Sequence, residues 1–241
     1  MKTINELVEV DAPSWPVLLD DLSSSFTPVE ILPPEPDRAA ACLLQLQVSA
    51  RSPLGAVVIN TGGLLLHGGW IRVFGGSGSG ELPGMAEVNR FPSTVEPGWR
   101  PADGLVLAHD VLGGVYAING VDAAEAGRPG APGEIVYFSP QSLQWSALEM
   151  GHSAWLGWLL AGGPADLYEL WPDWRSEVNG LRSDQGISFY PFLWSSEAQE
   201  DLAATSRKPV PMNDLLKTHQ IFCEQMDTGV PGFLGTYSTA P

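Results

Sequence analysis

The sequence predicts an α+β fold, in which a twisted, mainly antiparallel sheet of about five or six strands carries helices on its flanks. Three observations support this prediction. Helical patterns occupy both ends of the 241-residue chain, short runs of Val, Ile, Leu, Tyr and Phe fill its middle, and glycine pairs separate neighbouring runs. The 44% content of hydrophobic residues provides enough apolar surface for a core and excludes a disordered chain.

Two short helices are predicted near the N-terminus. Thr3 and Glu6 have the spacing of a capping box, and Pro16 stands where the first turn of a helix accepts proline. A short apolar run over residues 29–32 is closed by prolines, so it is expected to be extended. A further helix is then predicted over residues 36–46, where proline again precedes an apolar pattern.

The predicted sheet begins after Leu54, where apolar runs become short and glycine pairs separate several of them. Glycine pairs adopt the positive φ of tight hairpins, so successive strands are expected to pair antiparallel as a meander. The pairs are Gly62-Gly63, Gly68-Gly69 and Gly113-Gly114. The predicted strands are Ala56–Asn60, Leu64–Leu66, Trp70–Phe74, Leu105–His109, Val115–Asn119 and Ile135–Phe138.

Two long connections interrupt the predicted sheet, over residues 75–101 and 119–133. Connections of this length inside a domain are typical of functional or mobile segments. The first begins with six residues rich in glycine and serine, at positions 75–80. Neither Gly-Lys-Ser/Thr nor an apolar helix follows them, so a phosphate-binding loop is excluded and a flexible surface loop is predicted.

The C-terminal third is predicted to be mostly helical. Ser153 is expected to cap a helix that places Trp155 and Trp158 toward the core. A helical pattern resumes at Pro164 and includes Leu167, Leu170, Trp171 and Trp174. Residues 187–192 are predicted to be extended and residues 212–226 to form a last helix. The tail from residue 228 is predicted to be loop-like. The chain is therefore divided into an α+β core domain, 1–163, and a C-terminal extension, 164–241, that packs on it.

The chain is strongly acidic, with 28 Asp and Glu against 12 Lys and Arg and a net charge of −16. This charge repels phosphate backbones and anionic lipids, so nucleic acid and membrane surfaces are excluded as partners. No stretch has the length of a membrane span or the pattern of a signal peptide. The two cysteines, Cys42 and Cys223, indicate neither a disulfide framework nor a zinc site. A cytoplasmic location is therefore expected.

No residue pattern names a reaction. The four histidines are separated by 42, 43 and 67 positions, so no local metal site is predicted. No catalytic residue and no cofactor is predicted either. One alternative stays open: a small-molecule hydrolase in which the fold brings His109 or His152 to a carboxylate, Asp110 or Asp184. Another is a structural homodimer that associates through the aromatic residues of 187–194.

The order of several motifs over residues 30–163 resembles the SUKH superfamily, which includes cell-wall regulators and bacterial toxin-immunity proteins. The motifs are Asn60-Thr61-Gly62-Gly63, Trp70-Ile71-Arg72, Asp110-Val111-Leu112-Gly113-Gly114-Val115-Tyr116 and Val136-Tyr137, followed by an amphipathic helix over 152–161. The resemblance implies an antiparallel sheet with flanking helices. It also implies binding to another protein.

Nearly the whole chain resembles a bacterial family that is known only as a domain of unknown function. Its matching segments are Trp15-Pro16, Ser52-Pro53-Leu54-Gly55-Ala56, Gly69-Trp70-Ile71-Arg72 and Asp184-Gln185-Gly186-Ile187-Ser188-Phe189-Tyr190-Pro191-Phe192. This second resemblance implies no activity.

The function predicted from these observations is non-catalytic protein binding, with immunity to a basic toxin as its concrete form. The acidic charge would attract a cationic partner, no nucleophile, base or metal constellation is visible, and the motif order is SUKH-like. The candidate binding residues are Trp70, Arg72, Asp110, Tyr116 and Asp184.

Overall fold

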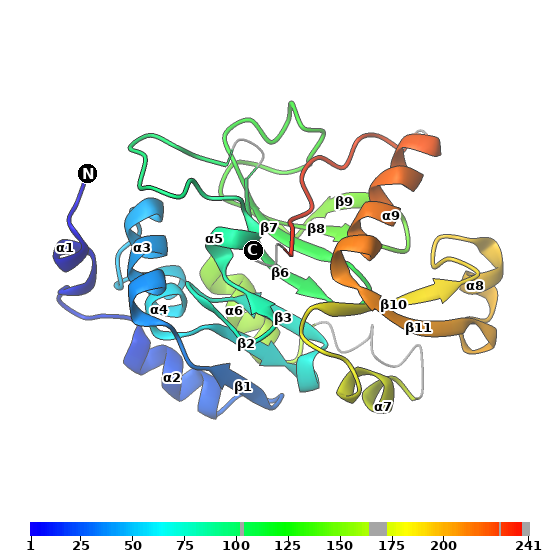
Figure 1. The fold of residues 1–241 in the computed structure, drawn as a ribbon, viewed down its shortest axis with the longest axis horizontal. Coiled ribbons are helices and arrows are strands. Elements are labelled where there is room, and N and C mark those ends of the chain that lie inside the picture. Colours follow the sequence, from blue (N-terminus) through cyan, green and yellow to red (C-terminus); the bar gives the residue numbers. More distant parts are fainter. Residues whose placement is uncertain (102–103, 164–172, 227, 238–241) are drawn as a thin grey trace.

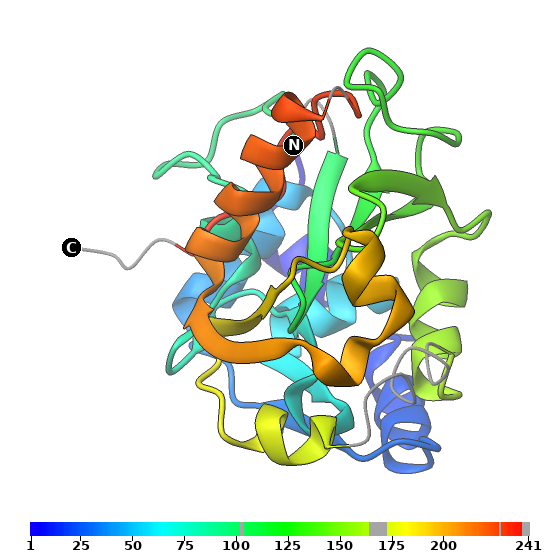
Figure 2. The same cartoon turned by 90° about the vertical axis from the view of Figure 1, so that its right-hand side faces the viewer.

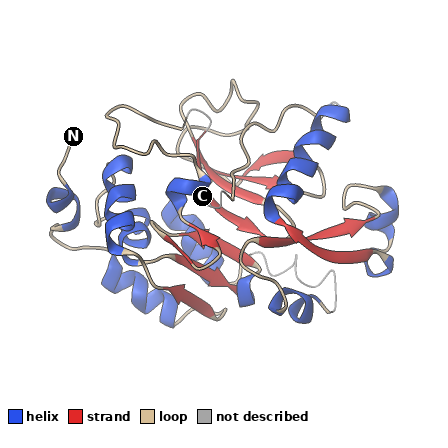
Figure 3. Cartoon of the chain, viewed as in Figure 1, coloured by secondary structure: helices blue, strands red, loops and turns tan. Residues whose placement is uncertain are grey.

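A seven-stranded antiparallel sheet crosses the centre of the computed structural model, which describes residues 1–101, 104–163, 173–226 and 228–237 (Figures 1 and 3). The strands follow one another across the sheet in chain order, and neighbours are antiparallel. The predicted α+β meander is confirmed, with more strands than expected. The strands are β1 (Val29–Leu32), β2 (Gly63–Leu66), β3 (Ile71–Phe74), β6 (Gly104–Asp110), β7 (Val115–Asn119), β8 (Ile135–Ser139) and β9 (Gln144–Ala147).

Two of the predicted glycine pairs form hairpin turns between neighbouring strands of this sheet. Gly68 and Gly69, at φ of 68° and 92°, connect β2 to β3, and Gly113, at 82°, connects β6 to β7. These φ values lie in the region that side chains with a Cβ rarely adopt, so glycine is required there. The third predicted pair, Gly62-Gly63, lies at the start of β2 and does not connect two strands, because the segment before it is helical.

The prediction of a strand over Ala56–Asn60 is wrong, since these residues belong to helix α4 (Pro53–Asn60). The Ser52 hydroxyl accepts a hydrogen bond from the Gly55 amide at 3.0 Å, and Pro53 occupies the first helical position. This start signal outweighs the strand preference of the β-branched residues that follow. Helix α4 then buries Ala56, Val57 and Val58 in the core, next to α3 (Pro36–Leu46).

The other predicted helices near the termini are present. They are α1 (Ile4–Val8), α2 (Trp15–Ser23) and α3 at the N-terminal end, α6 (His152–Leu160), and α9 (Met212–Gln225). Helices α6 and α9 lie on opposite faces of the sheet (Figures 1 and 2). The prediction that Ser153 caps α6 is wrong, because Gly151 holds the N-cap position. The Ser153 side chain lies in the first turn of the helix and is exposed.

The prediction of a flexible surface loop at residues 75–80 is also wrong. Residues 75–78 are buried, and a Cβ on Gly76 would lie 2.2 Å from the carbonyl oxygen of Val58. Glycine is required here for close approach of two backbones rather than for flexibility. The rest of this connection contains β4 (Gly78–Ser79), β5 (Leu82–Pro83) and the single-turn helix α5 (Met85–Val88).

The C-terminal third adds a second, two-stranded sheet that the sequence pattern only half predicted. The expected extended run is β10 (Gln185–Tyr190), and it pairs antiparallel with β11 (Ser206–Pro211), which was not predicted. Helices α7 (Trp174–Asn179) and α8 (Ser196–Glu200) flank this sheet. The predicted helical residues Leu167, Leu170 and Trp171 lie outside the described residues. The division into domains at residue 163 stays a prediction.

Candidate functional site

Four of the five predicted binding residues lie inside the protein. Trp70, Arg72, Asp110 and Tyr116 each expose 2% of their surface or less, whereas the Asp184 side chain is 25% exposed. Trp70 directly precedes β3, Arg72 lies within β3, Asp110 ends β6 and Tyr116 is on β7. The antiparallel register brings these residues together in the sheet. Their role in binding stays a prediction, and their contacts show what they do within the fold.

Arg72 connects the main sheet to the turn that precedes β10. Its Nη1 donates to the carbonyl oxygens of Ser183, at 3.0 Å, and Gln185, while its Nε donates to that of Gly69 at 3.2 Å. Burial lowers the pKa of Arg72, and the nearby Tyr237 hydroxyl opposes this shift. The guanidinium therefore acts as a cross-link between segments that are distant in the sequence.

Asp110 organises the β6–β7 hairpin. Its Oδ1 accepts hydrogen bonds from the amides of Leu112, at 2.8 Å, and Gly114, at 2.9 Å, and its Oδ2 accepts one from the Tyr137 hydroxyl at 2.8 Å. Burial raises the pKa of Asp110, and these hydrogen bonds oppose the shift. A small cavity of about 30 Å³ beside Asp110 and Trp70 has room for about one water molecule, too little for an organic substrate.

Tyr116 and Trp70 belong to aromatic clusters of the core. The ring of Tyr116 packs on those of Tyr137 and Trp155, with centroids 4.6 and 5.6 Å away. Burial raises the pKa of the Tyr116 hydroxyl. Trp70 meets Trp174 edge to face at 5.1 Å. Such contacts stabilise the packing of β3, β7, α6 and α7 against one another.

The two histidines considered for hydrolysis do not bond to a carboxylate in the described part of the chain. Nε2 of His109 lies 2.8 Å from the Leu234 carbonyl oxygen and Nδ1 lies 3.4 Å from the Tyr237 hydroxyl. Burial lowers the pKa of His109 to about 3, so the ring is neutral and donates from Nε2 to the carbonyl. His152 begins α6, and its buried Nδ1 has no hydrogen-bond partner among the described residues. Burial lowers its pKa to about 4.

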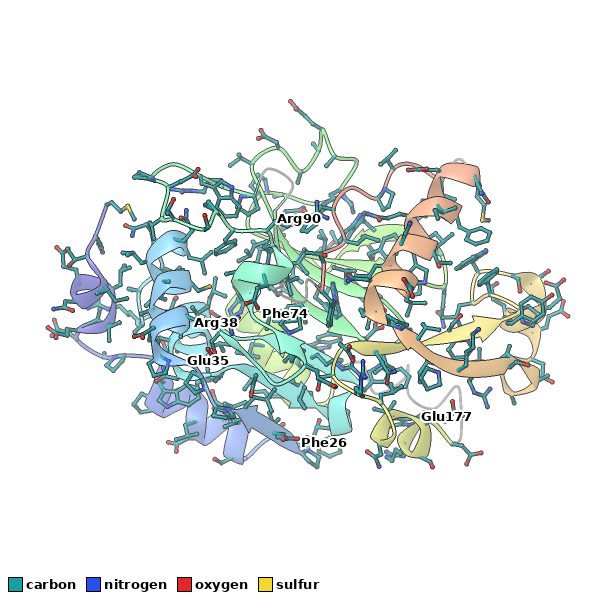
Figure 4. All side chains as sticks on the ribbon, viewed as in Figure 1. Phe26, Glu35, Arg38, Phe74, Arg90 and Glu177 are labelled. Carbon is teal, nitrogen blue, oxygen red and sulfur yellow. The ribbon has the colours of Figure 1, made fainter. Side chains whose placement is uncertain are left out.

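Asp184 opens onto a cleft of about 570 Å³ between α3, the β4–β5 hairpin and the start of α9. Five charged residues line this cleft, and they are paired with one another. Arg182 bonds Asp184 at 2.7 Å and Glu81 at 3.3 Å, and Arg38 pairs with Glu87. Figure 4 shows Arg38 on α3 beside the centre of the fold. These ion pairs connect α3 to α5, and the turn before β10 to the β4–β5 hairpin, so the charges act within the fold.

Residues 228–237 form a segment without helix or strand, as the predicted loop-like tail requires, and this segment covers His109. Leu234 is fully buried and Tyr237 is 7% exposed. The Asn213 side chain bonds both the amide and the carbonyl of Tyr237, at 2.7 and 2.6 Å. The signal for this packing is the presence of large apolar residues in a tail otherwise rich in Gly, Ser and Thr.

The N-terminal flank, residues 1–38, carries a block of exposed negative charge. All eight acidic residues of positions 1–38 are exposed, and they belong to α1, α2, β1, α3 and their connections. Figure 1 shows these elements together on one side of the molecule. Only Lys2 and Arg38 are basic in this stretch, and Arg38 already pairs with Glu35 at 3.2 Å. The acidic residues are Glu6, Glu9, Asp11, Asp20, Asp21, Glu30, Glu35 and Asp37.

Comparison with known proteins places this architecture in a family. Residues 4–215 match the family described as "Protein of unknown function DUF2625". The chain belongs to the DUF2625 family. It is 36% identical to the uncharacterized protein YbfG of Escherichia coli (strain K12) over 219 residues, which are 89% of this chain and 94% of that protein. It is 33% identical to an uncharacterized protein of Haemophilus influenzae over 196 residues, 80% of this chain and 83% of that protein. No solved structure matches the chain.

The DUF2625 match includes the whole seven-stranded sheet and ends within α9, so the covering segment 228–237 lies beyond it. Among the residues that the structure describes, no three His, Cys, Asp or Glu side chains gather closely enough to hold a metal ion. In the same residues, no helix has the length and apolarity that a membrane span requires. Both cysteines are free and buried.

Proposed function

We propose that the protein is a non-catalytic protein-binding module whose partner is basic. The exposed acidic flank of residues 1–38 carries this proposal. Its eight carboxylates face solvent on neighbouring elements, so their fields add over one side of the molecule. Such a surface accelerates encounter with a cationic protein and repels anionic ones. Immunity to a basic toxin is the concrete form of the proposal, and the SUKH-like order of motifs supports it.

The contacts of the histidines favour binding over the hydrolase alternative. Hydrolysis by a histidine and a carboxylate needs the two groups within hydrogen-bond reach at an open pocket. His109 is buried against Leu234 and Tyr237. The homodimer alternative rests on the aromatic run of 187–194, where Tyr190 is 72% exposed. Phe192 and Trp194, however, stack on each other and on α9.

The test is affinity capture from a lysate of the source bacterium, followed by titration of the purified partner by calorimetry. Reversing three flank charges should weaken binding of a basic partner by about tenfold or more and reduce its salt dependence. A control variant makes the same change in charge at distant exposed positions and should retain the affinity. The flank variant carries Glu9→Lys, Asp20→Lys and Glu30→Lys, and the control carries Glu125→Lys, Glu200→Lys and Glu224→Lys.

Equal losses in both variants would mean that only the net charge matters, and would refute a binding role of the flank. An acidic or uncharged partner, bound with equal affinity by all forms, would refute the proposal as a whole. The immunity form has its own test, which is growth. Co-expression of this chain with a captured basic toxin should restore growth, and the flank variant should restore it less.

A further inference from the structure

An open groove of about 700 Å³ lies between α6 and α2, the helix that carries Asp20 and Asp21 of the acidic flank. Its lining is largely apolar. Val17 and Leu18 of α2 line it from one helix, Leu156, Gly157 and Leu160 of α6 line it from the other, and Phe26 of the chain after α2 also contributes. The volume falls within the range of about 300–1,000 Å³ that is typical of ligand-binding clefts.

The walls of this groove are held together by hydrogen bonds. The amide of Phe26 donates to the carbonyl oxygen of Leu160 at 3.0 Å, and the Ser25 hydroxyl donates to the same oxygen at 2.8 Å. The chain after α2 is thereby fixed to the end of α6. A groove whose walls are fixed needs little reorganisation to receive a ligand.

The apolar side chains at this groove are unusually exposed. Phe26 exposes 83% of its surface and Val17 exposes 65%, and Figure 4 shows Phe26 at the edge of the molecule. Single exposed apolar residues are common, but a contiguous apolar groove with exposed residues at its edge is typical of an interaction site. Burying these two side chains would provide part of the driving force for binding.

The charge beside the groove indicates which partner fits it. Asp21 is the single charged residue among the described residues that line the groove. Asp20 stands next to it on the exposed face of α2, about 60° around the helix from Val17. Arg51 lies outside the lining, and its Nε donates to the Asp11 carbonyl oxygen at 3.2 Å. The groove is therefore mostly apolar, with the Asp21 carboxylate in its α2 wall and the exposed Asp20 beside it in the sequence.

We infer that this groove receives an amphipathic segment of the basic partner, with its apolar side chains between α2 and α6 and its Lys or Arg side chains against Asp20 and Asp21. This inference rests on the proposed function, because it assigns the contact site of the same partner. Its recognition mode is the insertion of apolar anchors into a groove, with flanking charges that select the partner.

Gly157 provides a sharp test of the inference. A Cβ at this position would meet no atom within 4 Å, and the backbone is helical, so a larger residue fits without strain. Gly157→Leu should fill the groove while it raises helix propensity. Ala154→Leu adds the same side chain to the same helix at an exposed position outside the lining. The charge variant is Asp21→Lys, with Glu224→Lys on α9 as its matched control.

The first probe is a dye-labelled synthetic peptide with Leu and Lys at helical spacing, measured by fluorescence anisotropy. A scrambled peptide of the same composition lacks the apolar face. The wild-type protein should bind the amphipathic peptide at least tenfold more tightly than the scrambled one. Gly157→Leu and Asp21→Lys should each weaken binding at least tenfold, and both controls should stay within twofold.

The possible failures are distinguishable from one another. Equal binding of both peptides would overturn docking in the groove but leave capture by charge, and so the proposed function, intact. Binding of neither peptide would overturn the inference, while capture of a basic protein through the flank would still be tested by the flank variants. A concentration-dependent dimer in sedimentation that Gly157→Leu abolishes would assign the groove to a second copy and overturn it too.

A second measurement follows the alkylation rate of a cysteine introduced into the groove. Both native thiols are buried, so Gly157→Cys places an accessible thiol in the groove. Bound peptide should slow its alkylation by a maleimide at least tenfold relative to the scrambled peptide. An unchanged alkylation rate at saturating peptide would overturn the inference, whatever the affinities.

Discussion

Replacing Asp110 with alanine should destabilise the fold strongly, because this carboxylate accepts hydrogen bonds from the backbone of the β6–β7 hairpin. The substitution removes three hydrogen bonds, from the amides of Leu112 and Gly114 and from the Tyr137 hydroxyl. Hydrogen bonds to a charged group contribute about 1.5–3 kcal/mol each. Release of a buried charge from its desolvated position offsets part of that sum.

The expected net loss is about 3–5 kcal/mol in the free energy of unfolding, which is a large fraction of the about 5–15 kcal/mol of a typical domain. Urea unfolding followed by tryptophan fluorescence and circular dichroism measures it. Tyr137→Phe removes one of the three hydrogen bonds and should cost about 1–2 kcal/mol. Asp110→Asn keeps an acceptor for the two amides, so it should fall between these variants.

A loss below about 1 kcal/mol for Asp110→Ala would refute this reasoning, since surface substitutions typically change stability by no more than about 0.5 kcal/mol. The same variant also separates two roles of Asp110. If its loss weakens binding of a partner while stability is retained, Asp110 contacts that partner. If only stability falls, the carboxylate acts within the fold.

Three further predictions concern pH, backbone packing and the covering segment. Burial lowers the pKa of His109 to about 3 and that of His219 to about 4. Histidine in the unfolded chain binds protons below about pH 6.5, so the contribution of these neutral rings to the free energy of unfolding is fully present above that pH. It should fall toward pH 4 by up to about 1.4 kcal/mol per pH unit for each ring. His219→Gln should reduce this slope in urea titrations, and an unchanged slope would contradict the prediction. Gly76→Ala should cost about 2 kcal/mol or more and lower Tm, because its Cβ would meet the Val58 carbonyl, whereas Gly151→Ala, in open space, should not. Leu234→Ala should cost about 2–5 kcal/mol and move the pKa of His109 up from about 3 in NMR titration; a pKa that stays at about 3 would mean that the segment still covers the ring.

Local signals in the sequence predicted most of the secondary structure correctly. Thr3 and Glu6 form the predicted capping box, and the glycine pairs at 68–69 and 113–114 form the predicted hairpins. These features depend on neighbouring residues, which the sequence displays directly. The errors arose where two local signals competed, as at Ala56–Asn60, or where packing gave a residue its meaning. The glycines around Gly76 predict a flexible loop, because nothing in the sequence shows that the backbone of Val58 lies against Gly76.

The candidate site residues illustrate the same limit. Arg72 is recognisable as an isolated charge in an apolar strand, but its partners Ser183 and Gln185 are more than 100 positions away. His109 meets Leu234 and Tyr237 at a similar separation. The groove between α2 and α6 joins residues from three parts of the chain, so no motif could predict it.

The sequence by itself determined the fold class, the antiparallel order of the strands and the net charge of −16, because periodicity, turn chemistry and composition are properties of the chain. The tertiary structure decided what each chemically distinctive residue contacts. It buried Arg72, His109 and Asp110, it left the carboxylates of residues 1–38 exposed, and it placed Asp21 at an open apolar groove. Contacts between distant segments depend on how the sheet and helices pack, and that packing is a property of the whole chain.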